Sequence, residues 1–166
     1  EQGGVLQERL VEAARRNRIR LLGPNCLGVM RPAIGLNATY GDDLPAKGKV
    51  ALVSQSGAIC SAMLDWAAPR RVGFSAVVSL GAAADVDFGD VLDYLALDPQ
   101  TQVILLYVEG IRDARRFMSG LRAAARLKPV IVIKGARQLA GTRAAKSHTG
   151  AFVGASEVFS AAMERG

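Results

Sequence analysis

Three separate segments carry side chains that could act on an anionic group, and the first is a serine-rich turn. Ser54, Ser56 and Gly57 follow the apolar run VALV and precede a helical pattern. Glycine permits a tight turn there, and serine hydroxyls together with the free N–H groups of a first helical turn would point at one spot. A plain serine N-cap, which stabilises a helix by about 1 kcal/mol, explains the same residues. Both interpretations stay open at this stage.

The second segment holds His148, the one histidine of the chain, in the polar stretch KSHTGA before the last apolar run. A metal site needs more ligands than one imidazole and scattered carboxylates, so we expect no metal here. Histidine can also act as a nucleophile and form a covalent intermediate. For phosphoryl transfer it would need a carboxylate that orients the ring and an electropositive cradle for the phosphoryl oxygens.

The third segment ends in Glu109, which follows the apolar run VILLYV and could supply that carboxylate. A charge at the end of a central strand needs solvent or a partner, so a glutamate that merely faces water is an equal alternative. If Glu109 and the serine turn flank His148, the three parts make one phosphohistidine site. A Ser56–His148 hydrolase pair is disfavoured, because the flanking glycines of the GxSxG elbow are missing.

The elements that must position these residues follow from the apolar rhythm. From Lys49 onward, short apolar runs alternate with amphipathic helical stretches, which predicts βαβ units and a mostly parallel sheet. Such sheets bind ligands beyond the carboxyl ends of their strands. Predicted strands cover residues 19–22, 50–54, 74–79, 102–108 and 130–134. Predicted helices cover residues 5–17, 58–68, 88–96, 114–126 and 150–163, and residues 23–48 are predicted to be a long connection.

Composition narrows the class of protein. A chain of 166 residues, half of them hydrophobic, can form one domain with a real core. Only 5% of the residues are aromatic, which argues against base-stacking nucleic-acid modules. The net charge of +6 arises mostly in helix-like segments, where a solvated helix face explains it better than a nucleic-acid groove. We therefore expect no nucleic-acid partner.

Compartment and completeness can also be predicted. Cys26 and Cys60 are isolated and are predicted to be buried thiols in a reducing compartment. No apolar run reaches the roughly 18 to 20 residues that span a bilayer, so we expect a soluble, cytoplasmic protein with no membrane partner. The chain begins without Met inside a helical pattern, which predicts a piece of a longer protein.

Six ordered segments, spread over essentially the whole chain, resemble the α-subunit side of the succinyl-CoA synthetase superfamily, the NDP-forming acyl-CoA synthetases. The resemblance implies an α/β fold, a flavodoxin-like three-layer sandwich with a mostly parallel sheet. It also implies that residues 1–35 are a remnant of a CoA-binding Rossmann domain with a linker, and that residues 36–166 are the flavodoxin domain. The segments are GPNCLG (23–28), ALVSQSGAI (51–59), VSLG (78–81), LYVEG (106–110), KPVIVIKGAR (128–137) and SHTGA (147–151).

The resemblance implies a role for each candidate residue. His148 would carry the phosphoryl group, and Glu109 would orient the histidine ring. CoA or acyl-CoA, and ATP or ADP with Mg²⁺, are the implied cofactors. The nucleotide and Mg²⁺ would bind an ATP-grasp domain or subunit that, like the rest of the Rossmann domain, lies outside this sequence, so the chain alone should not complete a reaction. The implied phosphate-binding residues are Ser54, Ser56 and Gly57, and the implied acyl and CoA site contains Gly23, Pro24, Asn25 and Gly81.

A second branch of the superfamily offers an alternative function. Residues 84–134 are similar to bacterial protein lysine acetyltransferases, in which a synthetase-like half is fused to a GNAT domain. That likeness implies a non-catalytic module that senses acyl-CoA, with a GNAT domain as partner. The intact SHTGA at residues 147–151 keeps phosphoryl transfer open. A missing Rossmann neighbour would also expose apolar surface around residues 1–35, through which copies could pair into a homo-oligomer.

Overall fold

A computed structural model describes residues 2–41 and 43–135, and its centre is a six-stranded sheet with the order β2-β1-β4-β3-β5-β6. The central and far strands pair in parallel, whereas the first two strands form an antiparallel edge, so the expected mostly parallel sheet is confirmed. The strands are β1 (Gly28–Arg31), β2 (Leu36–Thr39), β3 (Lys47–Ser54), β4 (Phe74–Ser79), β5 (Val103–Val108) and β6 (Val130–Lys134).

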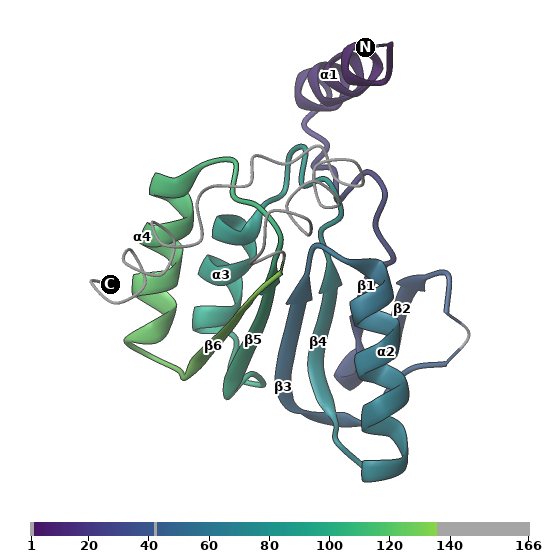
Figure 1. Cartoon of the computed structure of the whole chain (residues 1–166), viewed down its shortest axis with the longest axis vertical. Coiled ribbons are helices and arrows are strands. Elements are labelled where there is room, and N and C mark those ends of the chain that lie inside the picture. The colour runs from purple at the N-terminus through teal and green to yellow at the C-terminus, as the bar shows by residue number, and fades with distance from the viewer. Residues whose placement is uncertain (1, 42, 136–166) are drawn as a thin grey trace.

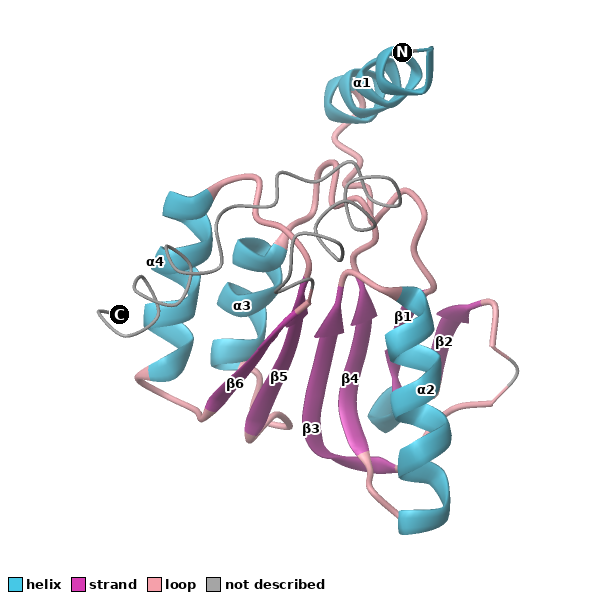
Figure 2. Cartoon of the chain, in the orientation of Figure 1, coloured by secondary structure: helices cyan, strands magenta, loops and turns pink. Residues whose placement is uncertain are grey.

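Helices cover both faces of this sheet and make three layers (Figure 2). Helix α2 (Gly57–Ala67) lies on one face, and α3 (Phe88–Leu97) with α4 (Ala114–Ala125) lies on the other (Figure 1). Side chains of a strand alternate between the two faces. Accordingly, Ala51 and Val53 join the core under α3 and α4, whereas Leu52 joins the core under α2. The expected three-layer α/β sandwich is thus confirmed.

Most predicted elements match the structure closely. The bounds of β4 and β6 are those predicted, β5, α3 and α4 differ by one residue at one end, and α2 begins and ends one residue earlier than predicted. Strand β3 and helix α1 (Gln2–Arg16) begin three residues earlier than predicted. At the start of α3, Asp87 and Asp90 form a capping box, in which the side chain of each accepts the backbone N–H of the other. The predicted helix 150–163 lies outside the described residues.

Two predictions about the first fifty residues were wrong. Residues 19–22 form no strand, because the segment contacts a loop instead of a strand edge: the Leu21 carbonyl accepts the Val86 N–H at 3.0 Å. Residues 23–48 are not one long connection, because they contain the β1–β2 hairpin around a short 3₁₀ turn, Pro32–Ile34. Strand β1 is held by pairing with β4 and by Met30, whose side chain is buried in the core under α2.

The hairpin is also fixed by a buried ion pair at the amino-terminal end of the parallel strands. Arg31 of β1 donates from Nη1 to Asp98 Oδ2 at 2.9 Å, and Asp98 follows α3. Thr101 donates its hydroxyl to the same carboxylate oxygen at 2.6 Å. These bonds join the antiparallel edge to the layer formed by α3. In the part of the chain that the structure describes, no helix has the length and apolar character needed to cross a membrane.

Candidate functional site

The segments that follow β3, β4 and β5 meet at the carboxyl edge of the sheet. The Leu80 N–H, just after β4, donates to the Ser54 carbonyl at 2.7 Å. On the other side, the Gln55 N–H donates to the Tyr107 carbonyl of β5 at 3.2 Å. Main-chain bonds therefore join the ends of β3, β4 and β5, and the loops that follow these strands start from a rigid base.

The turn at residues 54–57 places its two serines differently. Ser54 is fully buried, and its hydroxyl donates to the Ser56 carbonyl at 2.8 Å and accepts the Ser56 N–H at 3.0 Å. Ser56 is the N-cap of α2, and its Oγ accepts the Ile59 N–H at 3.3 Å. Gly57 is the first residue of α2. Ser54 thus shapes the turn, whereas Ser56 and Gly57 lie at the positive end of a helix, where backbone N–H groups favour an anion.

Glu109 lies beside this turn, because the side chain of Gln55, between the two serines, is hydrogen-bonded to the Glu109 main chain. Gln55 is only 3% exposed, and its Oε1 accepts the Glu109 N–H at 2.7 Å and the Gly110 N–H at 2.9 Å. The structure therefore brings together two of the three predicted parts of the site. The sequence analysis did not single out Gln55. Its position directly after a buried strand could have indicated a role, since a buried amide side chain must be hydrogen-bonded.

Lys134, at the end of β6, is a second residue that the sequence reasoning missed. Its Nζ donates to the Glu109 carbonyl at 2.7 Å and to the Gly135 carbonyl at 3.0 Å. Burial lowers the pKa of Lys134, and the Glu109 carboxylate opposes that effect. Burial raises the pKa of Tyr107, and the Glu109 charge adds to it. Glu109 is therefore a half-buried carboxylate within electrostatic reach of an ammonium group, and not a glutamate that simply faces water.

The predicted acyl and CoA residues also gather at this edge. Gly23 and Pro24 present their carbonyl groups to the loop after β4, where the Ala84 and Ala82 N–H groups donate to them at 2.9 Å each. Gly81 has φ +55°, and a Cβ built on it would lie 2.3 Å from the carbonyl oxygens of both Pro24 and Asn25. The four residues that the resemblance grouped are thus in direct contact. Their role in binding an acyl group or CoA stays a prediction.

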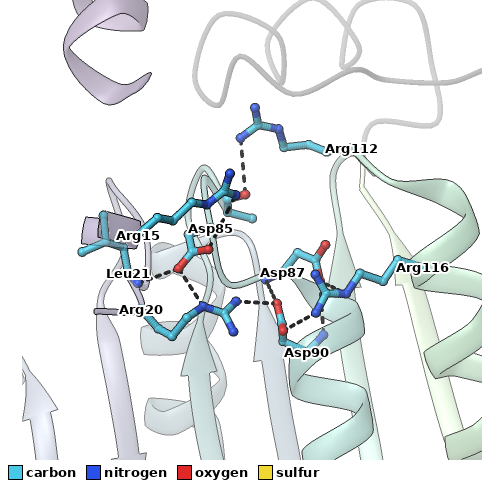
Figure 3. A network of polar contacts seen from close by, with 9 residues as sticks. Arg15, Arg20, Leu21, Asp85, Asp87, Asp90, Arg112 and Arg116 are labelled. Atoms are coloured by element: carbon cyan, nitrogen blue, oxygen red, sulfur yellow. Dashed lines mark hydrogen bonds and ion pairs between the residues drawn. The ribbon is translucent and has the colours of Figure 1, made fainter. Parts of the chain in front are cut away.

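An ion-pair network ties the N-terminal segment to the same loop (Figure 3). Asp85 accepts the Leu21 N–H and the Arg20 Nε, each at 2.9 Å, and its side chain is 6% exposed. Burial alone would raise the pKa of Asp85, but its bonds to Arg20 and to the Leu21 N–H lower it. Arg20 and Arg116 both pair with Asp90 of α3. The segment that follows α1 is thereby fixed against α3 and the loop after β4.

The two cysteines, Cys26 and Cys60, are free thiols. Cys60 of α2 is fully buried, and burial raises its pKa to about 11 although the Ser54 and Ser79 hydroxyls oppose the shift. Cys26 is half-buried, and burial raises its pKa as well. Both side chains are therefore protonated near neutral pH. Within residues 2–41 and 43–135, no three His, Cys, Asp or Glu residues cluster as metal ligands would.

His148 lies outside the described residues, together with the rest of SHTGA. The third part of the predicted site is therefore not placed against the serine turn and Glu109. What the structure provides is the base on which such a residue could act, namely an anion-compatible helix N-terminus and a carboxylate joined by Gln55.

Comparison with known proteins gives consistent matches. The succinyl-CoA ligase like flavodoxin domain family matches residues 47–166. Acetate–CoA ligase [ADP-forming] I of Archaeoglobus fulgidus is 46% identical over 164 residues, which are 99% of this chain and 24% of that protein. The alpha subunit of acetate–CoA ligase [ADP-forming] I of Pyrococcus furiosus is 44% identical over 165 residues, 99% of this chain and 36% of that subunit.

A solved structure is also similar throughout. The dinucleotide forming acetyl-coenzyme A synthetase 1 of Ca. Korarchaeum cryptofilum, in complex with phosphate and ADP, superposes with a TM-score of 0.88 at 40% identity. The match covers 96% of this chain and 35% of that one. The chain thus spans about a quarter to a third of the length of these proteins. Their names are those of CoA ligases and synthetases, so they give no support to the acetyltransferase alternative.

Proposed function

Because the chain belongs to the family of succinyl-CoA ligase-like flavodoxin domains, we propose that it is the phosphohistidine-bearing part of an NDP-forming acyl-CoA synthetase. The observation that carries the proposal is the Gln55 bridge, which sets the helix N-terminus at Ser56 and Gly57 directly beside Glu109. A phosphohistidine relay needs those two parts next to each other, one for the phosphoryl oxygens and one for the imidazole.

The proposed reaction has three transfers. A phosphate oxygen attacks the thioester carbonyl of acyl-CoA, and the CoA thiolate leaves to give an acyl phosphate. A ring nitrogen of His148 attacks the phosphorus, and the carboxylate of the acid leaves. The phosphoryl group then passes from His148 to a nucleoside diphosphate. The reverse order makes acyl-CoA from the acid, CoA and a nucleoside triphosphate.

Each described residue has a task in that sequence. The first N–H groups of α2 and the Ser56 hydroxyl would bind phosphate or the phosphoryl group. The Glu109 carboxylate would accept a hydrogen bond from one imidazole nitrogen, so that the other faces the phosphorus. Ser54 is the weakest member of the set, since its hydroxyl is buried and bonded within the turn. In the sequence, Gly135, Gly141 and Gly150 lie on either side of His148, and glycines at these positions would favour the movement between sites that the proposed relay needs.

The remaining substrates would come from other domains. The segment at Gly23, Pro24 and Asn25, with Gly81 beneath it, would line the acyl and CoA site. Nucleotide and Mg²⁺ would bind an ATP-grasp domain or subunit, in keeping with relatives that are named ADP-forming ligases or their alpha subunit. The remainder of a CoA-binding Rossmann domain would cover helix α1, where Val5, Leu6 and Leu10 are more than half exposed. Residues 1–35 would be the end of that domain and its linker.

Phosphate labelling of the full-length protein tests the proposal. The protein is incubated with γ-phosphate-labelled ATP and Mg²⁺ and quenched at alkaline pH, which preserves a phosphoramidate. We expect acid-labile label on the wild type and none on His148→Ala. Glu109→Gln should label more slowly, because its amide orients the ring less firmly than a carboxylate does. Absence of label on the wild type, with acyl-CoA still bound, would refute the relay.

A further inference from the structure

The main chain of Glu109 lies just beyond the point where β5 stops pairing with its neighbours. The last main-chain bonds at this edge go to the two preceding residues. The Gln55 N–H donates to the Tyr107 carbonyl at 3.2 Å, and the Gly135 N–H donates to the Val108 carbonyl at 2.9 Å. The sheet ladder therefore ends one residue before the carboxylate that the proposed chemistry uses.

Side chains take over where the ladder ends. The Glu109 N–H donates to Gln55 Oε1 and the Glu109 carbonyl accepts from Lys134 Nζ, each at 2.7 Å. These two side chains come from opposite sides of β5, one after β3 and the other at the end of β6. Gln55 is almost fully buried and Lys134 half-buried, so water competes little for the bonds. Both polar main-chain groups of Glu109 are thus fixed from two directions.

We infer that Gln55 and Lys134 are positioning residues, which hold the Glu109 main chain and thereby fix the orientation of its carboxylate. The inference rests on the proposed function, which gives Glu109 its task. Gln55 adds a second constraint, since it lies between Ser54 and Ser56. It thereby sets the separation between the phosphoryl-binding turn and the carboxylate.

A positioning role and a merely structural role predict different results. A site residue displaced by about 1 Å can lose on the order of 100-fold in rate while the binding of distant substrate groups stays intact. If Gln55 and Lys134 position Glu109, their loss slows phosphorylation of the histidine and leaves the KM for nucleotide unchanged, because nucleotide binds another domain. If they only stabilise the fold, thermal stability and all kinetic constants fall together.

The experiment uses the full-length protein with its nucleotide-binding domain and measures the single-turnover rate of phosphohistidine formation. Gln55→Met and Lys134→Met remove the two bonds to Glu109. Gln102→Met and Lys49→Met make the same changes at exposed positions and serve as matched controls. We expect the first two variants to be about 10- to 100-fold slower with an unchanged nucleotide KM. The two controls should match the wild type.

Hydrogen exchange supplies a readout that does not depend on activity. Gln55→Met should lose protection of the Glu109 and Gly110 amides. Gln55→Glu, which keeps an acceptor oxygen in place, should retain that protection and recover most of the rate. Recovery in Gln55→Glu supports positioning even if Gln55→Met folds poorly.

The outcomes separate the two claims. A wild type that never labels refutes the proposed function and the inference with it. A wild type that labels, beside a Gln55→Met variant of equal rate, overturns the inference alone. The inference also fails if the slow variants lose nucleotide affinity and thermal stability together and Gln55→Glu recovers neither.

Discussion

Replacing Gly81 by alanine should release the segment at Pro24 and Asn25 from the carboxyl edge of the sheet. The new Cβ would lie 2.3 Å from two carbonyl oxygens, and both belong to the main chain, which cannot rotate away as a side chain could. The residue would also keep a φ of +55°, in the left-handed region that L-residues avoid. Gly81→Ala therefore combines a steric cost with a conformational one.

The control variant Gly35→Ala separates the steric cost from the conformational cost. It has φ +69°, and a Cβ at this position would meet no heavy atom within 4 Å, so Gly35→Ala carries only the conformational part. That part is about 1–2 kcal/mol for an L-residue in the left-handed region. Overpacking at Gly81 adds about 1–3 kcal/mol. Alanine restricts the unfolded chain equally at both positions, so this effect cancels in the comparison.

Denaturant titration followed by circular dichroism measures the difference. We expect Gly81→Ala to lose about 1–3 kcal/mol more free energy of unfolding than Gly35→Ala. Hydrogen exchange should also show lost protection of the Ala82 and Ala84 amides, which donate to Pro24 and Gly23. Equal destabilisation of the two variants, with both amides still protected, would show that the carbonyl groups do not press on Gly81.

Three further predictions concern Asp98, Ser56 and the pair of Asp85 with Arg20. Asp98→Ala leaves Arg31 buried without its carboxylate and should cost about 3–5 kcal/mol, measured by denaturant titration. Burial alone would raise the pKa of Asp98, but the bond from Arg31 holds this pKa below its usual value. The stabilisation is therefore present above the unfolded-state pKa, near pH 4, and is lost as the pH falls further. In an acid titration, the stability of Asp98→Ala should fall less steeply than that of the wild type. Ser56→Ala should destabilise α2 by about 1 kcal/mol and Ser56→Gly by only a few tenths, yet both should slow histidine labelling; normal labelling would limit Ser56 to a cap. Arg20→Ala should cost more than Asp85→Ala in thermal unfolding, because it leaves a carboxylate that is 6% exposed without this partner, whereas Asp85→Ala leaves a guanidinium that is 55% exposed and hydrated; the reverse order would contradict this.

Sequence patterns located the parallel strands because each of them is a short, mostly apolar run of residues. The runs at Phe74–Ser79 and Val130–Lys134 are almost continuously apolar and are followed or preceded by turn residues, so their bounds needed no tertiary information. Strand β1 differs, since it has only four residues, begins at a glycine and is followed by a proline. Its pairing with β4 and the burial of Met30 are long-range effects that no local window contains. The hairpin was therefore missed.

In the candidate site, too, one part follows from the predicted topology and another depends on tertiary packing. Parallel topology predicts that the ends of β3 and β5 meet, which places the serine turn and Glu109 at one edge without further knowledge. The bond from the Glu109 N–H to Gln55 depends on register: Ser54, the last residue of β3, pairs with Tyr107 near the end of β5, so the residue after β3 reaches the main chain just after β5. Register is set by the packed core, so the type and spacing of residues did not reveal Gln55.

The phosphoryl-binding turn and the acyl segment are connected through two consecutive residues, Leu80 and Gly81. Leu80 donates to the Ser54 carbonyl of the phosphoryl-binding turn, and its neighbour Gly81 lies directly under Pro24 and Asn25 of the acyl segment. A displacement of either segment therefore reaches the other through two consecutive residues. Under the proposed function, this contact lets an acyl phosphate form and donate its phosphoryl group at a single edge of the sheet.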